Sequence, residues 1–115
     1  MTSAKWIFRI AGIWGLAVIL PLYFADTSQM AEPAYYFGFA GVALAFQVAF
    51  LVISTDPVRY RMLMPVCVFE KLSTLPLIFL YLAGRGNEDF FVGGIVDQVL
   101  AVAFIAAFLM TPKKA

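Results

Sequence analysis

Four apolar stretches, each about twenty residues long, occupy most of this 115-residue chain. They cover residues 6–24, 34–53, 62–82 and 90–110. A helix needs about 20 mostly apolar residues, or about 30 Å of rise, to cross the hydrocarbon core of a bilayer. The pattern therefore predicts four transmembrane helices.

The composition excludes the soluble and disordered classes. The chain is 63% hydrophobic and 13% charged, whereas ordinary soluble domains are about 45–50% apolar and about 25% charged. A chain this short cannot bury so much apolar surface in a water-soluble core, and disorder requires low hydrophobicity. We expect one all-α integral membrane domain over residues 1–115.

The connections between the four stretches are short, roughly 3–9 residues, which makes consecutive helices antiparallel neighbours in an up-down-up-down four-helix bundle. Pro33 suits the first turn of the second helix, and Asp56 is a candidate N-cap for the third. Gly84 is a candidate terminator of the third helix, and Asn87 a candidate cap of the fourth. Pro76 is expected to bend the third helix because it frees a backbone carbonyl one turn earlier.

Basic residues are unevenly divided between the two sides of such a bundle. The side that carries both termini and the 54–61 loop holds six of the eight, which are Lys5, Arg9, Arg59, Arg61, Lys113 and Lys114. The opposite side holds Arg85 together with four acidic residues. Short loops rich in Lys and Arg stay in the cytoplasm, so both termini are predicted to be cytoplasmic.

Several function classes lack the residues that they require. A net charge of +1 offers no basic face for nucleic acid. The absence of His excludes imidazole metal sites and the Ser-His-Asp triad, and the single Cys67 excludes a thiolate zinc cluster. We therefore expect no metal, no cofactor and no assignable catalytic residue, and we favour a non-enzymatic protein.

Three ionisable residues lie inside the predicted spans, where such groups are costly and mark functional candidates: Glu70, Lys71 and Asp97. Counting from the outer ends of the spans places Glu70 roughly 20 Å deep, Lys71 roughly 18 Å and Asp97 roughly 10 Å. A Lys71–Asp97 pair is within reach of a lysine side chain, and Thr74 lies between them in depth. Adjacent helical residues point about 100° apart, so we expect Lys71 to face away from Glu70. Glu70 would then stay protonated and face Gln47, which lies at the same depth.

Two rows of residues at helical spacing predict a cleft. One row on the third span holds Cys67, Glu70, Thr74, Leu77 and Tyr81, and one on the second span holds Tyr36, Ala40, Ala43 and Gln47. If the rows meet, they line an outward-opening cleft with Tyr36 and Tyr81 at its mouth and Glu70 at its floor. The same polar groups could instead fix helix register, or contact another subunit.

Other features suggest contacts with lipid or between helices. Arg59 and Arg61 flank Tyr60, where anionic lipid headgroups would attract them. The small residues Gly41, Ala45 and Ala49 form a row along which two backbones could approach, and the first span contains Gly12 and Gly15. Trp14 lies in the middle of a span and is expected to face lipid or a neighbouring helix.

Three blocks carry a resemblance to known proteins: residues 35–47 (YYFGFAGVALAFQ), residues 56–61 (DPVRYR) and the pair Glu70-Lys71. In these blocks the chain resembles a group of small four-helix bacterial inner-membrane proteins. The resemblance implies a multi-pass protein of the bacterial inner (cytoplasmic) membrane, but no particular activity. In length and helix count the chain is also similar to DoxX-type proteins, a likeness of architecture only. Small multidrug exporters have a membrane Glu in the first helix, which this chain lacks.

The sequence leaves three functions open. The first is a non-enzymatic bundle in the lipid bilayer that binds a lipophilic small molecule or serves as an accessory subunit of a larger membrane complex. The second is a small transporter or channel that uses the intramembrane carboxylates and works as a homo-oligomer. The third is a membrane enzyme acting on an isoprenoid or quinone-like substrate.

Overall fold

The computed structural model describes residues 2–113 and shows helices without strands in that range. Met1, Lys114 and Ala115 lie outside the described residues, so the place of Lys114 in the basic set has no structural counterpart. Within the described range, four stretches are long and apolar enough to cross a membrane: Ser3–Phe24, Pro33–Thr55, Arg61–Leu82 and Glu88–Met110. The prediction of an all-helical chain with four long helical stretches is confirmed.

Two of the four stretches are interrupted. The first consists of α1 (Thr2–Ile19) and the 3-10 turn η1 (Leu20–Phe24), which begins beside Pro21. The third consists of the 3-10 turn η2 (Arg61–Leu63), α3 (Met64–Leu72) and α4 (Leu75–Leu82). The second and fourth are continuous helices, α2 (Pro33–Thr55) and α5 (Glu88–Met110).

Most of the expected helix ends are present. Pro33 is the first residue of α2, and Gly84 follows α4 with a φ of 76°, a left-handed conformation that suits glycine. The Asn87 side chain caps α5 by accepting the backbone N–H of Asp89 at 2.7 Å. The expected cap at Asp56 is wrong for α3, which begins only at Met64. Asp56 instead accepts the N–H of Arg59 at 3.3 Å and closes a local turn.

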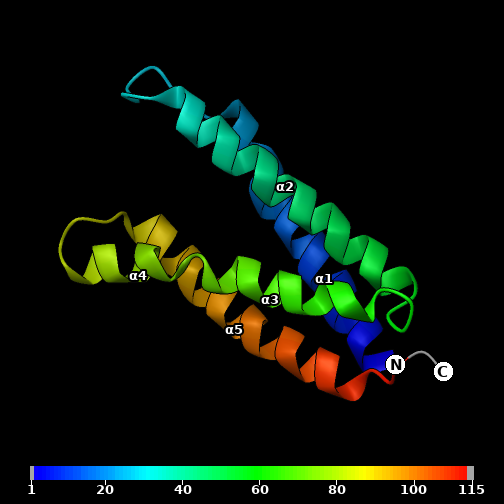
Figure 1. The fold of residues 1–115 in the computed structure, drawn as a ribbon. Helices are drawn as coiled ribbons and strands as arrows, with labels where there is room; N and C mark the ends of the chain where they lie inside the picture. The colour runs from blue at the N-terminus through cyan, green and yellow to red at the C-terminus, as the bar shows by residue number, and fades with distance from the viewer. Residues whose placement is uncertain (1, 114–115) are drawn as a thin grey trace.

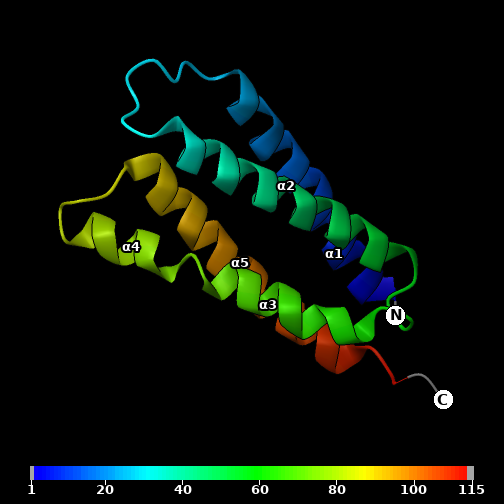
Figure 2. The ribbon, with the colours of Figure 1, turned by 45° about the horizontal axis from the view of Figure 1, so that its top comes forward.

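The helices form two hairpins (Figures 1 and 2). One pairs α1 with α2, and the other pairs α3 and α4 with α5. The hairpins meet near the chain termini, where α1 also packs against α5, and diverge toward the opposite end (Figure 1). Contact between α2 and α3 is slight. The arrangement is therefore tight at the terminal end and open at the other.

An aromatic cluster joins the hairpins. The ring of Phe8 on α1 stacks on that of Phe104 on α5 with 4.3 Å between centroids. Phe50 on α2 lies 4.9 Å from Phe104 in an edge-on arrangement. The core around them also contains Ala4, Ala11, Ile53, Met64, Cys67 and Ala107. Cys67 is buried there as an apolar side chain and does not face the expected cleft.

Two glycines of α1 pack tightly against α2. A Cβ added at Gly12 would lie 2.8 Å from the Leu51 side chain, and one at Gly15 would overlap the Gln47 amide. The expected small-residue row on α2 is wrong as the contact face, because Ala45 is exposed and a Cβ at Gly41 meets only the Tyr23 hydroxyl, at 3.6 Å. The buried face of α2 contains Ala40, Ala43, Gln47, Phe50, Ile53 and Ser54.

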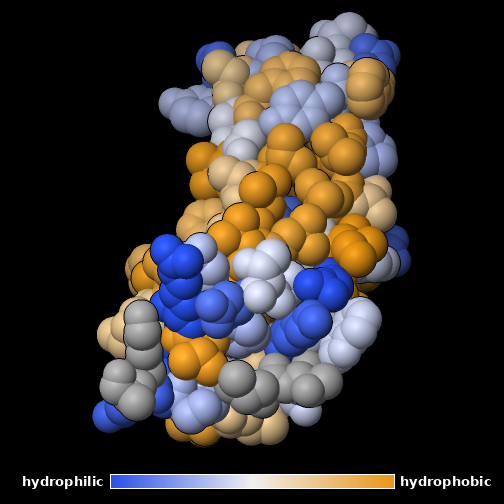
Figure 3. Space-filling model, turned by 90° about the vertical axis from the view of Figure 1, so that its right-hand side faces the viewer, coloured by the Kyte–Doolittle hydropathy of each residue, from blue (hydrophilic) through white to orange (hydrophobic). Residues whose placement is uncertain are grey.

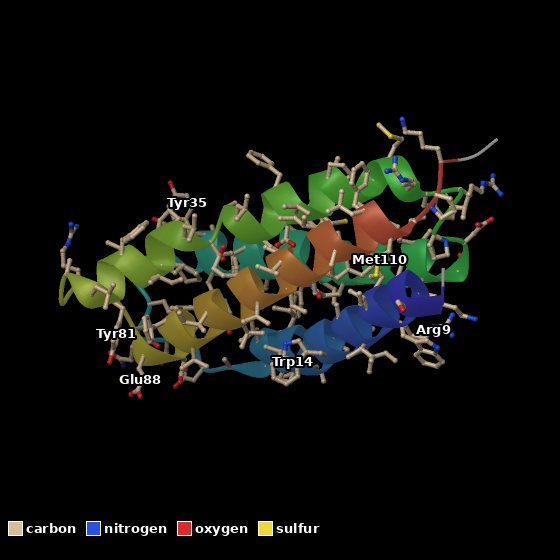
Figure 4. The ribbon with its side chains drawn as sticks, turned by 90° about the horizontal axis from the view of Figure 1, so that it is seen from below. Arg9, Trp14, Tyr35, Tyr81, Glu88 and Met110 are labelled. Atoms are coloured by element: carbon tan, nitrogen blue, oxygen red, sulfur yellow. The ribbon has the colours of Figure 1, made fainter. Side chains whose placement is uncertain are left out.

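The surface is divided along the long axis of the molecule. Figure 3 shows hydrophilic side chains gathered near the terminal end and a band of apolar side chains above them. Arg9 lies at the terminal end, Tyr81 and Glu88 lie at the opposite end, and Trp14 points outward between them (Figure 4). Trp14 is half exposed.

Candidate functional site

The centre of the site is the break between α3 and α4 at Ser73 and Thr74. Pro76 has no N–H to donate to the carbonyl of Leu72, so the α-helical ladder cannot continue through this point. Polar side chains bond the backbone around the break: the Thr74 hydroxyl donates to the Lys71 carbonyl at 2.8 Å. Gln98 on α5 donates from Nε2 to the same carbonyl and to the Thr74 hydroxyl, each at 3.0 Å. The predicted bend at Pro76 is thus a break at which the Lys71 carbonyl and the Thr74 hydroxyl accept hydrogen bonds from a neighbouring helix.

Lys71 is buried, with 4% of its surface exposed, and lies between two carboxylates. Its Nζ donates to Asp97 Oδ1 at 3.1 Å, the pair that the depths predict. The same Nζ lies 3.6 Å from Glu70 Oε1, so the expectation that Lys71 faces away from Glu70 is wrong. The long lysine side chain spans the angle between adjacent helical positions, which an argument from Cα directions ignores.

The Glu70 carboxyl group is not fully hydrogen-bonded. Its Oε1 atom is buried and has no hydrogen-bond partner among the described residues. The expected partner, Gln47, instead donates from Nε2 to the Ala43 carbonyl of its own helix at 2.8 Å and lies against Gly15. The cluster therefore contains one ammonium group and two carboxyl groups, of which Asp97 has the shorter contact with Lys71.

A cavity of about 840 Å³ lies between α2 on one side and α3 and α4 on the other. Five residues of the two rows predicted from the sequence line this cavity: Tyr36, Ala43, Glu70, Thr74 and Leu77. Further lining residues are Met30, Tyr35, Gly38, Phe39, Val42, Phe46, Val66, Phe69, Ser73 and Phe90. Tyr35 and Phe69 are largely exposed, so the cavity is open along its side. We call it the aromatic cavity.

The two tyrosines of the predicted mouth differ in position. Tyr36 lines the aromatic cavity, and its hydroxyl donates to the Leu22 carbonyl in η1 at 2.7 Å. Tyr81 lies outside the cavity and stacks on Phe91, with 4.3 Å between ring centroids.

A smaller cavity of about 200 Å³ lies on the other side of the polar cluster, between α1 and α5. Its polar lining includes Gln47, Lys71 and Asp97, and Trp14 and Gly15 contribute from α1. Thr74 borders both cavities. Glu70 lines only the aromatic cavity and Asp97 only the smaller one, so the two carboxyl groups face different spaces.

The two arginines expected at lipid headgroups have different surroundings. Arg59 is exposed. Arg61 donates from Nε to the Thr111 carbonyl at 2.7 Å, and its guanidinium carbon lies 3.9 Å from the centre of the Phe108 ring. Through these two contacts Arg61 holds the C-terminal end of α5 against η2, the start of the third helical stretch.

The sequence prediction leaves two parts of the site unassigned. It places the Gln98 amide inside the fourth predicted span but gives it no partner, and in the structure this amide bridges the helix break. The aromatic lining was missed because phenylalanines occur on every span and sequence alone does not fix which of them share a space. In comparisons with known proteins, no family model, curated protein or solved structure matches this chain.

Proposed function

We propose that the chain crosses a bacterial inner membrane four times in an up-down-up-down bundle, with both termini in the cytoplasm. The four apolar helical stretches support this proposal. The structure also brings the N-terminus, the connection after α2 and the end of α5 to one end of the molecule (Figure 1), where most basic residues of the chain gather. Short basic segments are retained on the cytoplasmic side.

We further propose that the protein is a non-enzymatic bundle that binds a lipophilic small molecule in the aromatic cavity. The observation that carries this proposal is the cavity itself, about 840 Å³ with an almost entirely apolar lining and a few polar groups at Glu70, Ser73 and Thr74. Ligand sites typically measure about 300–1,000 Å³ and combine apolar walls with a few polar groups that orient the ligand.

The position of the carboxyl groups favours binding over catalysis. An acid and a base must both reach the reacting atoms of one substrate. Glu70 and Asp97 each contact Lys71, but they line different cavities. A ligand in the aromatic cavity therefore reaches only one of the two carboxyl groups, that of Glu70.

A matched pair of tryptophan variants tests the binding proposal. Val66 lines the aromatic cavity, whereas Val102 on α5 is exposed and borders neither cavity. Val66→Trp should reduce the lipid or lipophile that native mass spectrometry detects on mildly extracted protein, and Val102→Trp should leave it unchanged. Equal retention by both variants would show that the cavity is not the binding site.

A further inference from the structure

We propose that the ligand of the aromatic cavity is a lipophilic cation, with its positive centre beside Glu70 and its hydrocarbon body among the aromatic side chains. This inference rests on the proposed function, because it assigns a chemical class to the occupant of the same cavity. Three observations lead to it: the charge balance of the polar cluster, the position of Glu70 and the nature of the lining.

The polar cluster has more carboxyl groups than cations. Lys71 is shared between Asp97 at 3.1 Å and Glu70 at 3.6 Å, and only the Asp97 contact is a hydrogen bond. With all three groups ionised, the cluster has a net charge of −1. A buried charge without a counter-charge is unfavourable, and such a group takes up a proton instead. A cation next to Glu70 would take the place of that proton and complete the charge balance.

Glu70 lies where such a cation could reach it. Its side chain is 15% exposed and borders the aromatic cavity. Among the described residues, no Lys or Arg lines this cavity, and Glu70 is its one charged group. Within the lining, a positive ligand head would therefore meet one attractive group, whereas an anionic head would be repelled. The nearest cation, Lys71, lies outside the lining, with its Nζ 3.6 Å from Glu70 Oε1.

The lining suits a cation that carries a hydrocarbon body. Tyr35, Tyr36, Phe39, Phe46, Phe69 and Phe90 border the space. Aromatic faces attract cations through their quadrupoles, and the attraction grows when water is excluded. A neutral lipophile would gain the apolar contacts but no charge interaction with Glu70.

Three probes of similar aromatic character and different charge test the proposal on the unmodified protein in a nonionic detergent. They are the tetraphenylphosphonium cation, neutral triphenylphosphine oxide and the tetraphenylborate anion, measured by equilibrium dialysis. We expect the cation to bind about tenfold more tightly than the neutral probe, a difference of about 1.4 kcal/mol, and the anion to bind most weakly. Equal binding of cation and neutral probe would overturn the inference.

Two Glu→Gln substitutions test whether the preference for the cation depends on Glu70. Glu70→Gln should remove the preference for the cation and leave the neutral probe unaffected. Glu88→Gln removes a charge at the exposed start of α5, outside both cavities, and should preserve the preference. A preference that survives Glu70→Gln would also contradict the assignment. The probe ranking on the unmodified chain needs no variant, so it decides the question even if Glu70→Gln fails to fold.

A third substitution examines the sharing of Lys71. Asp97→Asn leaves Lys71 with Glu70 as its remaining carboxylate, so Lys71 should compete with the ligand and weaken cation binding. Unchanged cation affinity in this variant would contradict the charge balance described above.

The outcomes separate this inference from the proposed function. If no probe binds in a manner sensitive to Val66→Trp, the binding function itself is wrong. If the neutral probe binds as well as the cation and Val66→Trp abolishes both, the cavity is a ligand site and only its preference for positive charge is wrong.

Discussion

Among single residues, Lys71 stands out because its charged side chain is buried. It is a buried ammonium group whose one hydrogen-bonded counter-charge is Asp97. We expect Asp97→Asn to lower the free energy of unfolding by about 2–3 kcal/mol, below the usual cost of breaking a buried pair because Glu70 remains nearby. Thermal unfolding in detergent measures this. The triple variant Lys71→Met, Asp97→Leu and Glu70→Gln, which leaves no unpaired charge in the cluster, should recover much of the loss. No recovery would show that the charge pair is not the cause.

Gly15 is the residue at which α1 and α2 leave least room. An added methyl group would overlap the Gln47 amide, whereas at Gly38 nothing lies within 4 Å of an added Cβ. We expect Gly15→Ala to destabilise the protein by about 1–3 kcal/mol, the usual cost of overfilling a packed contact. Gly38→Ala should be neutral or slightly stabilising because alanine favours helix. Equal melting temperatures would mean that Gln47 moves aside freely.

The sequence predicts some residue contacts of the site and not others, for a physical reason. Depth along a helix follows from counting residues, which is why the Lys71–Asp97 pair was predictable. Rotation about the helix axis and the conformation of long side chains do not follow from counting. The contact between Lys71 and Glu70 was therefore missed, and Gln47 was paired with Glu70 although its amide bonds to its own helix.

At the scale of elements, the break between α3 and α4 depends on α5. We expect Gln98→Leu to destabilise the protein by about 1–3 kcal/mol, because it leaves the Lys71 carbonyl and the Thr74 hydroxyl without their partner on α5. Val99→Leu, at the exposed neighbouring position, is the control and should change little. Thermal unfolding of both variants in one detergent makes the comparison. A Gln98→Leu variant as stable as the control would show that the break needs no support from α5.

The helical elements themselves were largely predictable, since hydrophobic runs and the local signals at Pro33, Gly84 and Asn87 act over a few residues. The prediction at Asp56 failed because a turn and the 3-10 segment η2 follow it before α3 begins. The sequence pattern also did not indicate how the helix is interrupted at Pro76, since the Gln98 side chain that bonds this region comes from α5.

At the scale of the whole molecule, the proposed orientation has a direct test. Lys113 follows α5, which ends at the terminal end of the molecule, and Arg85 belongs to the connection between α4 and α5, which lies at the opposite end (Figure 1). In a Cys67→Ser background, Arg85→Cys should react with a membrane-impermeant thiol reagent in intact cells. Lys113→Cys should react only after the membrane is opened. Reaction of position 113 from outside intact cells would refute cytoplasmic termini.

The sequence does not predict how the two hairpins are arranged relative to each other. Short loops indicate which helices are neighbours in sequence, but they do not determine how one hairpin crosses the next. The divergence of the hairpins, and with it the aromatic cavity, depends on where the large side chains of four helices meet.

The aromatic cluster at the terminal end also bears on the order of assembly during synthesis. Phe8 belongs to α1 and Phe104 to α5, which is made later, and the two rings stack on each other. Domains begin to fold as the chain emerges from the ribosome, N-terminal segments first. The hairpin of α1 and α2 can form before α5 is made, but its Phe8 and Phe50 then still lack their contact with Phe104. A nascent chain that ends before Phe104 therefore lacks the ring that joins the two hairpins, so this fold cannot be completed until α5 has been made.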